Sequence, residues 1–84
     1  MLKHVKNYYT TFNLVCSDEV FCTQCGALAV DIHHIKFRSQ GGSDQIENLI
    51  ALCRKHHTYA HDHNTLEHRK HLTELQKNLL EEVL

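Results

Sequence analysis

Apolar residues near the start of the chain recur at steps of three and four positions. The residues that share this spacing are Leu2, Val5, Tyr9 and Phe12. One face of a helix has this period. We therefore expect a helix within residues 1–15.

In the middle of the chain, apolar residues gather in two short runs instead. These runs cover residues 28–37 and 48–53, and the first follows "CTQCG", which is typical of a tight turn. Between them lies "RSQGGSDQ", whose glycines, serine and aspartate mark a loop. Runs of this length bounded by turns predict two strands.

The last third of the chain returns to helical spacing. We expect one helix to begin near residue 54, just after the second strand. Another is expected from Asn64, because Asn64 and Glu67 have the spacing of a capping box. Its apolar stripe, expected to pack on the domain rather than on a second copy, consists of Leu72, Leu75, Leu79 and Val83, widened near the end by Leu80 and Leu84.

The composition indicates one small domain, residues 1–84, that needs a staple. A chain of this size buries only about 60% of its unfolded surface, and such domains depend on metals or disulfides. Side chains that could bind a metal or form disulfides are present, because the chain has four cysteines and nine histidines. Its net charge is −1, from nine basic and ten acidic residues. That balance does not indicate nucleic acid, so such a partner must be inferred from motifs.

The sequence favours a cytoplasmic protein without membrane contact. No stretch approaches the roughly 20 apolar residues that span a bilayer. The first residues, "MLKHVKNYYTTFNL", lack the uninterrupted apolar run of a signal peptide. Thiols stay reduced in the cytoplasm, so the cysteines are better interpreted as metal ligands than as disulfides.

Four residues form two ligand pairs of equal spacing. Cys22 and Cys25 are separated by two residues, as are Cys53 and His56. Three thiolates and one imidazole make a tetrahedral set that suits structural zinc. Cys16 is left over, and we interpret it as a plain buried thiol, with replacement of His56 as fourth ligand as the alternative.

Histidines form a second constellation. His33 and His34 are adjacent in the first predicted strand, with Asp31 just upstream. His57 and His61 are four residues apart and share one face of a helix, which makes a half-site for a divalent metal. The zinc ligands tie the start of that helix to the turn before the strand, so the histidines are expected to come together.

The order of these motifs closely resembles that of the HNH endonuclease family. The matching segments are "CTQC", "DIHHI", "GGSDQIENL" and "ALCRKHH", which span residues 22–61. The resemblance implies an α+β fold: a small zinc-stapled ββα-metal core of β-hairpin and helix, flanked here by the N-terminal helix and a C-terminal helix of about residues 64–84.

The resemblance also implies roles for single residues. His34 stands in the position of the general base, and Asn48 in that of the asparagine that braces the catalytic loop. His33 and His57 match metal ligands, and His61 matches the further ligand of histidine-rich members. We expect the regular strand to end or kink at the two adjacent histidines, so that one holds the metal and the other faces the attacking water.

The implied activity is metal-dependent hydrolysis of DNA phosphodiester bonds. It needs one catalytic divalent metal, with Mg, Mn, Ni, Co and Zn as candidates. Arg38, Arg54 and Lys55 are candidate contacts to backbone phosphates. A bacterial or phage-infected cell is the expected setting. Two alternatives stay open: a non-catalytic zinc module that binds nucleic acid or protein, and an accessory nuclease that needs a larger phage or mobile-element partner.

The sequence leaves Asp31 open between two roles. It either orients a metal ligand as a neighbouring carboxylate or is a solvated strand residue. The histidines outside the motifs are expected at the surface, namely His4, His63, His68 and His71.

Overall fold

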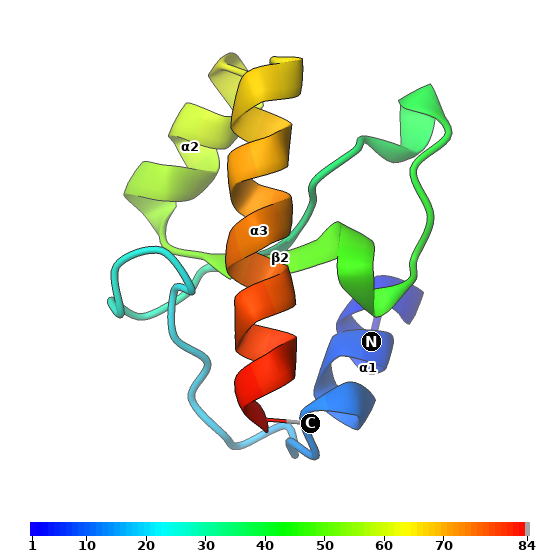
Figure 1. The fold of residues 1–84 in the computed structure, drawn as a ribbon. Coiled ribbons are helices and arrows are strands. Elements are labelled where there is room, and N and C mark those ends of the chain that lie inside the picture. Colours follow the sequence, from blue (N-terminus) through cyan, green and yellow to red (C-terminus); the bar gives the residue numbers. More distant parts are fainter. Residues whose placement is uncertain (84) are drawn as a thin grey trace.

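A computed structural model describes residues 1–83 of the chain. Its elements, in chain order, are α1 (Lys3–Thr11), β1 (Asp31–His34), two single turns of 3-10 helix (Arg38–Gln40 and Ile46–Asn48), β2 (Leu49–Leu52), α2 (Arg54–Asp62) and α3 (Leu66–Val83). Figure 1 shows the short hairpin at the centre of these helices. The predicted α+β class, with a hairpin followed by a helix and flanked by two further helices, is confirmed.

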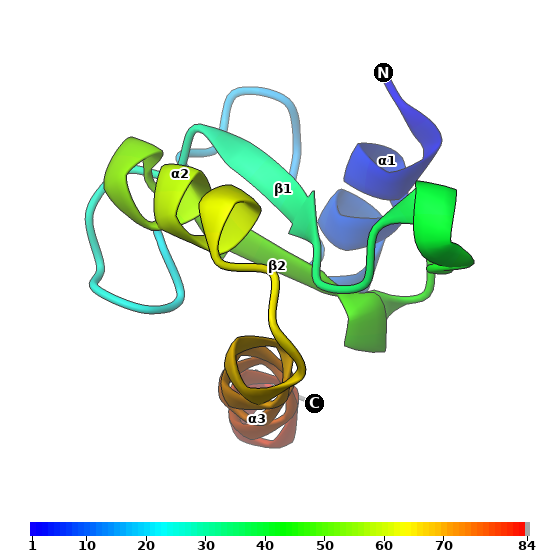
Figure 2. The same cartoon turned by 90° about the horizontal axis from the view of Figure 1, so that it is seen from above.

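The two strands pair antiparallel, and their register decides which helix each side chain meets. Ile32 lies opposite Ala51, and His33 lies opposite Ile50. Successive side chains of a strand point to opposite faces. The hairpin therefore has one face that meets α1 and another that meets α2 and α3, and α1 and α3 lie on opposite sides of it (Figure 2).

The α1 face is closed by a small apolar cluster. Tyr8 of α1 packs with Ile32, Leu49 and Ala51. Helix α1 has only nine residues and no side-chain cap, and isolated helices of that length are marginal in water. Its stability therefore comes from this packing.

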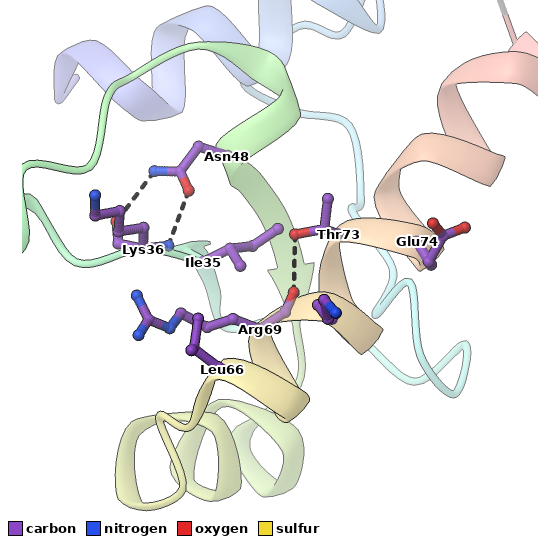
Figure 3. Close-up of a pocket in the computed structure, with 8 residues that line it drawn as sticks. Ile35, Lys36, Asn48, Leu66, Arg69, Thr73 and Glu74 are labelled. Carbon is purple, nitrogen blue, oxygen red and sulfur yellow. Dashed lines mark hydrogen bonds between the residues drawn. The ribbon is translucent and has the colours of Figure 1, made fainter.

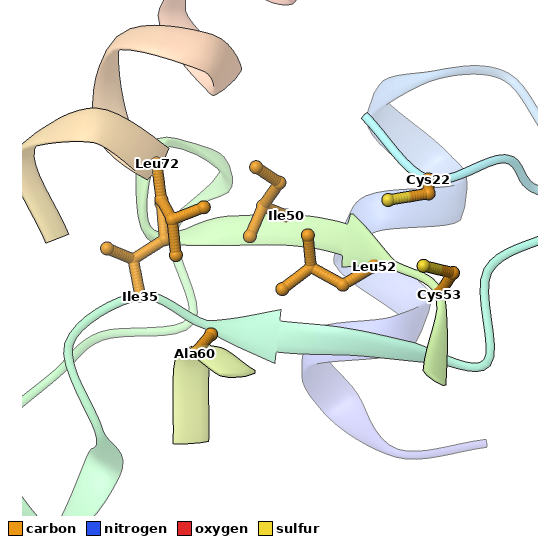
Figure 4. Close-up of a cluster of buried hydrophobic side chains, with 7 residues drawn as sticks. All are labelled: Cys22, Ile35, Ile50, Leu52, Cys53, Ala60 and Leu72. Atoms are coloured by element: carbon orange, nitrogen blue, oxygen red, sulfur yellow. The ribbon is translucent and has the colours of Figure 1, made fainter. Parts of the chain in front are cut away.

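The opposite face forms the main core, drawn in Figure 4. Ile50 and Leu52 of β2 pack with Ala60 of α2 and Leu72 of α3. The sulfurs of Cys22 and Cys53 lie at one end of this cluster. The core therefore runs directly into the cysteine pairs that the sequence predicts as zinc ligands.

Helix α3 is present as expected, but the capping residue differs. The hydroxyl of Thr65 accepts a hydrogen bond from the His68 backbone N–H at 3.1 Å, and the Thr65 carbonyl accepts one from Arg69. Thr65, not Asn64, is thus the N-cap, and the predicted capping box of Asn64 and Glu67 is wrong by one residue. The cause is tertiary, because the Asn64 amide instead faces Gln40.

The apolar stripe of α3 packs on the domain over its first half. Leu72 is buried and Leu75 packs against the same cluster, whereas Val83 is 53% exposed. Gln76, which no pattern predicted, is fully buried and donates to the Ile46 carbonyl at 3.2 Å. The predicted contribution of residue 84 lies outside the described residues.

Both strands are shorter than the apolar runs that predicted them. The residues before β1 pair with the turn that carries Cys22, through a bridge between Phe21 and Leu28. After His34 the chain leaves the hairpin for the loop. Within residues 1–83, no helix is long and apolar enough to cross a membrane.

Candidate metal centres and active site

Three cysteines and one histidine converge at the end of the hairpin. One donor atom each of Cys22, Cys25, Cys53 and His56 lies within 4.8 Å of all the others. A short turn presents the first pair: the Cys22 N–H donates to Ala27 and the Gly26 N–H donates to Cys22. Gly26 has a φ of 82°, a left-handed conformation that costs glycine nothing.

The second pair stands at the start of α2. Cys53 is the residue before the helix, and its carbonyl accepts the first helical bond, from His57. The backbone N–H of His56 points at the Cys53 sulfur and lowers the pKa of this thiol to about 6. Cys53 is therefore poised to bind metal as a thiolate at neutral pH.

The spacing of these donors fits zinc. Zn–S bonds of about 2.3 Å put the corners of a tetrahedron about 3.8 Å apart. The Cys25 and Cys53 sulfurs are 3.7 Å apart, and the Cys22 sulfur is 3.7 Å from Nδ1 of His56. Cys16 is not part of this group, and the expectation of a buried thiol is wrong, because Cys16 is exposed. The cluster is thus a Cys3His set able to hold zinc, with His56 as its fourth member.

The two adjacent histidines of β1 face different helices. The ring of His33 lies 5.3 Å from that of His57 on α2, and the ring of His34 lies 4.4 Å from that of His4 on α1. This is the alternation expected of a regular strand. The strand does end at His34, as predicted, but no kink is needed to separate the two side chains.

Both histidines nevertheless reach one hollow of about 420 Å³. It runs along the edge of β1 that β2 leaves unpaired, and therefore receives side chains from both faces of the hairpin. Its walls come from α1, β1, the loop after β1 and α2, and include His4, Asp31, His33, His34, Arg38, His57 and His61.

His33 is suited to binding a cation on its side of the hollow. It is 4% exposed, and its Nε2 atom has no hydrogen-bond partner. Burial, together with the neighbouring His57, lowers the pKa of His33 to about 4, so its ring is neutral at pH 7. A buried imidazole nitrogen with no partner is costly unless something binds it.

Asp31 and His57 complete the wall next to His33. Nε2 of His57 lies 3.4 Å from a carboxylate oxygen of Asp31, whose side chain lines the hollow and is 46% exposed to solvent. His61 also lines the hollow, but its side chain is 69% exposed and its ring stacks on Phe37. The donor atoms of these four residues are less tightly gathered than those of the cysteine cluster.

His34 is held by a carboxylate that the sequence did not single out. Its Nε2 atom lies 2.8 Å from Oδ1 of Asp44, and both side chains are 13% exposed. Hydrogen bonding to His34 lowers the pKa of Asp44, so the carboxylate is ionised at neutral pH. Asp44 therefore favours the tautomer of His34 that carries its proton on Nε2.

The loop that carries Asp44 is fixed by Asn48. The Asn48 side chain accepts a hydrogen bond from the Lys36 N–H at 2.8 Å and donates one to the Lys36 carbonyl (Figure 3). It also donates to the Ser43 carbonyl. Gly42 passes so close to Lys36 that a Cβ atom would lie 1.8 Å from its carbonyl oxygen. Asn48 thus connects the two ends of the loop, as the resemblance implied. It does not line the hollow itself and acts on the site by holding the loop that carries Asp44.

The three expected phosphate contacts are divided by the fold. Arg38 lines the hollow beside His34, and its charge contributes to the lowered pKa of Asp44. Arg54 and Lys55 are exposed at the start of α2 and do not line the hollow. Lys55 lies instead beside His56, near the cysteine cluster.

Two residues of the site were not predicted from the sequence. One is His4, which was expected at the surface but is half-buried against His34. Outside the site, His68 was also expected at the surface and is half-buried. Asp44 was expected only as part of a loop. No local signal links His4 to a strand thirty positions away, whereas the acidic residue after the two glycines was an available clue.

Comparison with known proteins supports the resemblance that the motifs suggest. No curated protein and no solved structure matched the chain. The family model described as HNH endonuclease matches residues 22–63, which is half of the chain. The matched segment contains the cysteine cluster, both histidines of β1, Asn48 and α2. The chain belongs to the HNH endonuclease family.

Proposed function

We propose that this chain is a metal-dependent endonuclease that hydrolyses DNA phosphodiester bonds, with His34 as general base. The observation that carries the proposal is that His33 and His34 line one hollow while contacting different partners. Hydrolysis needs both a site for a cation and a base for water. Adjacent residues of one strand supply these two functions from opposite faces.

The proton step belongs to His34. The Nε2–H group of His34 donates a hydrogen bond to Asp44, so the ring keeps its Nδ1 lone pair for a proton from the attacking water. The resulting hydroxide oxygen attacks phosphorus in line, the bond from phosphorus to the 3′ oxygen breaks, and the leaving 3′ oxygen takes a proton from solvent water to become a hydroxyl. Asp44 remains ionised and stabilises the positive charge that His34 gains.

His33 and His57 are proposed to hold the catalytic metal, with Asp31 and His61 as further ligands. A divalent cation supplies charge neutralisation at the scissile phosphate and at the leaving oxygen when it is bound. The neutral, unpartnered Nε2 of His33 and the carboxylate of Asp31 fit such an ion chemically. Imidazole ligands favour Zn, Ni and Co over Mg in affinity, and availability in the cell selects among them.

The DNA backbone is proposed to reach the hollow beside Arg38. This side chain is on the wall of the hollow and can bind the phosphate next to the scissile one. The net charge of −1 means that long-range attraction to DNA is weak. Binding is therefore expected to depend on contacts at the site itself.

Plasmid relaxation by the purified chain tests this proposal. The protein, with its zinc retained, is incubated with supercoiled DNA and with Mg, Mn, Ni or Co in turn. Wild type should cleave with at least one of these metals, and His34→Ala should not. His63→Ala is the matched control, because this exposed histidine stacks on Tyr59 outside the hollow. Absence of cleavage by wild type with every metal would refute the proposed activity.

A further inference from the structure

A second group of metal-type ligands lies on the α1 side of the hollow. His4 of α1, His34 of β1 and Asp44 of the loop each offer one donor atom, and the three atoms lie within 4.8 Å of one another. The three residues come from distant parts of the chain. Two of them, His34 and Asp44, already form an ion pair at 2.8 Å.

This arrangement fits a six-coordinate ion as well as a hydrogen bond. Metal–ligand bonds of about 2.1 Å place neighbouring corners of an octahedron about 3.0 Å apart, and two histidines with one carboxylate are a recurrent set for divalent transition metals. When the ion binds Nε2 of His34, the proton on that nitrogen is replaced, and the neutral imidazole ligand carries its proton on Nδ1. All three residues are half-buried, and two of them line the hollow, so an ion can enter from solvent.

We propose that His4, His34 and Asp44 form a second transition-metal site, and that its occupation inhibits cleavage. The inhibition rests on the proposed function, because His34 bound to the ion through Nε2 carries its proton on Nδ1, the nitrogen that the proposed mechanism needs as proton acceptor. The binding itself does not depend on that function. The site differs from the cysteine cluster and from the His33 side of the hollow.

The chemistry of the donors sets the order of metals. Two imidazoles favour Zn, Ni and Co over Mg, which prefers oxygen ligands and keeps its water. Lys3 and Arg38 lie close enough to influence the charge of Asp44, and their positive charges oppose a cation. The site is therefore expected to fill only at metal concentrations above those that saturate the His33 side.

The site is a property of this chain rather than of the family motif. His4 precedes residues 22–63, the segment that matches the family. Helix α1 brings it to the hollow through the packing of Tyr8 on the hairpin. Its neighbour Asn7 donates to the Asp44 carbonyl at 3.0 Å, which fixes the loop ligand relative to the helix ligand.

Calorimetric titration with Ni²⁺ tests the binding, using protein that retains its structural zinc. Wild type should show two classes of site, of which His57→Ala loses one and His4→Ala the other. Loss of a ligand should weaken its site at least about tenfold, the lower effect known for outer-shell partners. His71→Ala, an exposed histidine of α3, should bind as wild type does and reports adventitious surface binding.

Asp44→Asn provides a second test if His4→Ala disturbs α1. Both variants should lose the weaker class of site while keeping the stronger one. Titration curves of His4→Ala and Asp44→Asn that match the wild-type curve would overturn the proposal.

Cleavage assays then test inhibition. The readout is cleavage in excess Zn²⁺ divided by cleavage at the optimal metal concentration, measured within each variant. For wild type, excess Zn²⁺ should lower cleavage at least about tenfold relative to the optimal metal concentration. For His4→Ala the ratio should stay near one. Excess Mg²⁺ in place of Zn²⁺ should not lower the cleavage by wild type. Equal inhibition of both proteins would overturn the inference. Failure of wild type to cleave under any condition would instead overturn the proposed function, while the binding result would stand.

Discussion

Nε2 of His34 lies 2.8 Å from Oδ1 of Asp44, although the two residues are ten positions apart and belong to a strand and a loop. This contact fixes one nitrogen of the ring and leaves the other for chemistry. The neighbouring His33 makes no such contact and keeps its Nε2 unpartnered. The same residue type therefore stands in two different environments at consecutive positions.

The first prediction separates the two histidines. His34→Ala should lower the cleavage rate by about 10²–10⁴, the contribution of a positioned base, without changing the melting temperature or the bound zinc. His33→Ala should weaken binding of the catalytic metal, and added metal should restore part of its activity. Cleavage rates as a function of metal concentration distinguish the two. Full activity of His34→Ala would remove this residue from the mechanism.

The second prediction concerns the cysteine cluster. Cys22→Ser should lose zinc and unfold, because binding energy at such sites is folding energy, roughly 10–16 kcal/mol in small zinc peptides. Cys16→Ser, at an exposed thiol outside the cluster, is the control and should keep both zinc and melting temperature. Native mass spectrometry and thermal denaturation provide the measurements. A Cys22→Ser protein that melts as wild type does would show that the domain does not depend on the metal.

The third prediction compares two neighbouring glycines of the loop. A Cβ at position 42 would lie 1.8 Å from the Lys36 carbonyl oxygen, so Gly42→Ala must displace the segment that Asn48 fixes. A Cβ at position 41 would meet only the flexible Lys36 Nζ atom, at 4.0 Å, and Gly41 has a positive φ of 86°, so Gly41→Ala should cost about 1–2 kcal/mol. Gly42→Ala should lower the melting temperature more and also weaken cleavage by moving Asp44. Equal melting temperatures for the two variants would contradict the crowding at position 42.

The fourth prediction follows from the burial of His33. Its pKa of about 4 lies below the value of 6.5 for a free imidazole, so the unfolded chain takes up the proton first as the pH falls. The contribution of this residue to stability should be constant above about pH 6.5 and decrease between pH 6.5 and 4. In urea titrations across this range, wild type should lose stability more steeply than His33→Gln. The same slope for both would show that His33 is not protected from protonation.

Much of the fold could be predicted because local patterns and tertiary contacts agree. The period of Val5, Tyr9 and Phe12 matches the face of α1 and its end that packs on the hairpin, whereas Leu2, the first of the period, is 68% exposed. The equal spacing of the two ligand pairs correctly predicts that Cys22 and His56 belong to one cluster. A helical period and the spacing within a ligand pair each involve only a few neighbouring residues, so both can be recognised in the sequence.

Other features depend on contacts between distant residues and could not be predicted. Thr65 takes the cap because the Asn64 side chain faces Gln40 across the structure. His4 joins the site only because α1 docks on the face of the hairpin that presents His34. The amide nitrogen of the buried Gln76 finds a partner in the distant Ile46 carbonyl, whereas its Oε1 atom has none. In each case the position of a polar side chain depends on a partner that is distant in the sequence, so the adjacent residues do not predict it.

The alternation of β1 also has an evolutionary consequence. Because His33 and His34 point to opposite faces, the residues that support them belong to separate parts of the molecule: α2 and the cysteine cluster for one, α1 and the glycine loop for the other. Substitutions among the residues that support one histidine therefore leave the direct contacts of the other in place. Under the proposed function, the ligands of the catalytic metal could therefore change through α2, and the partners of the general base through α1, one selective step at a time.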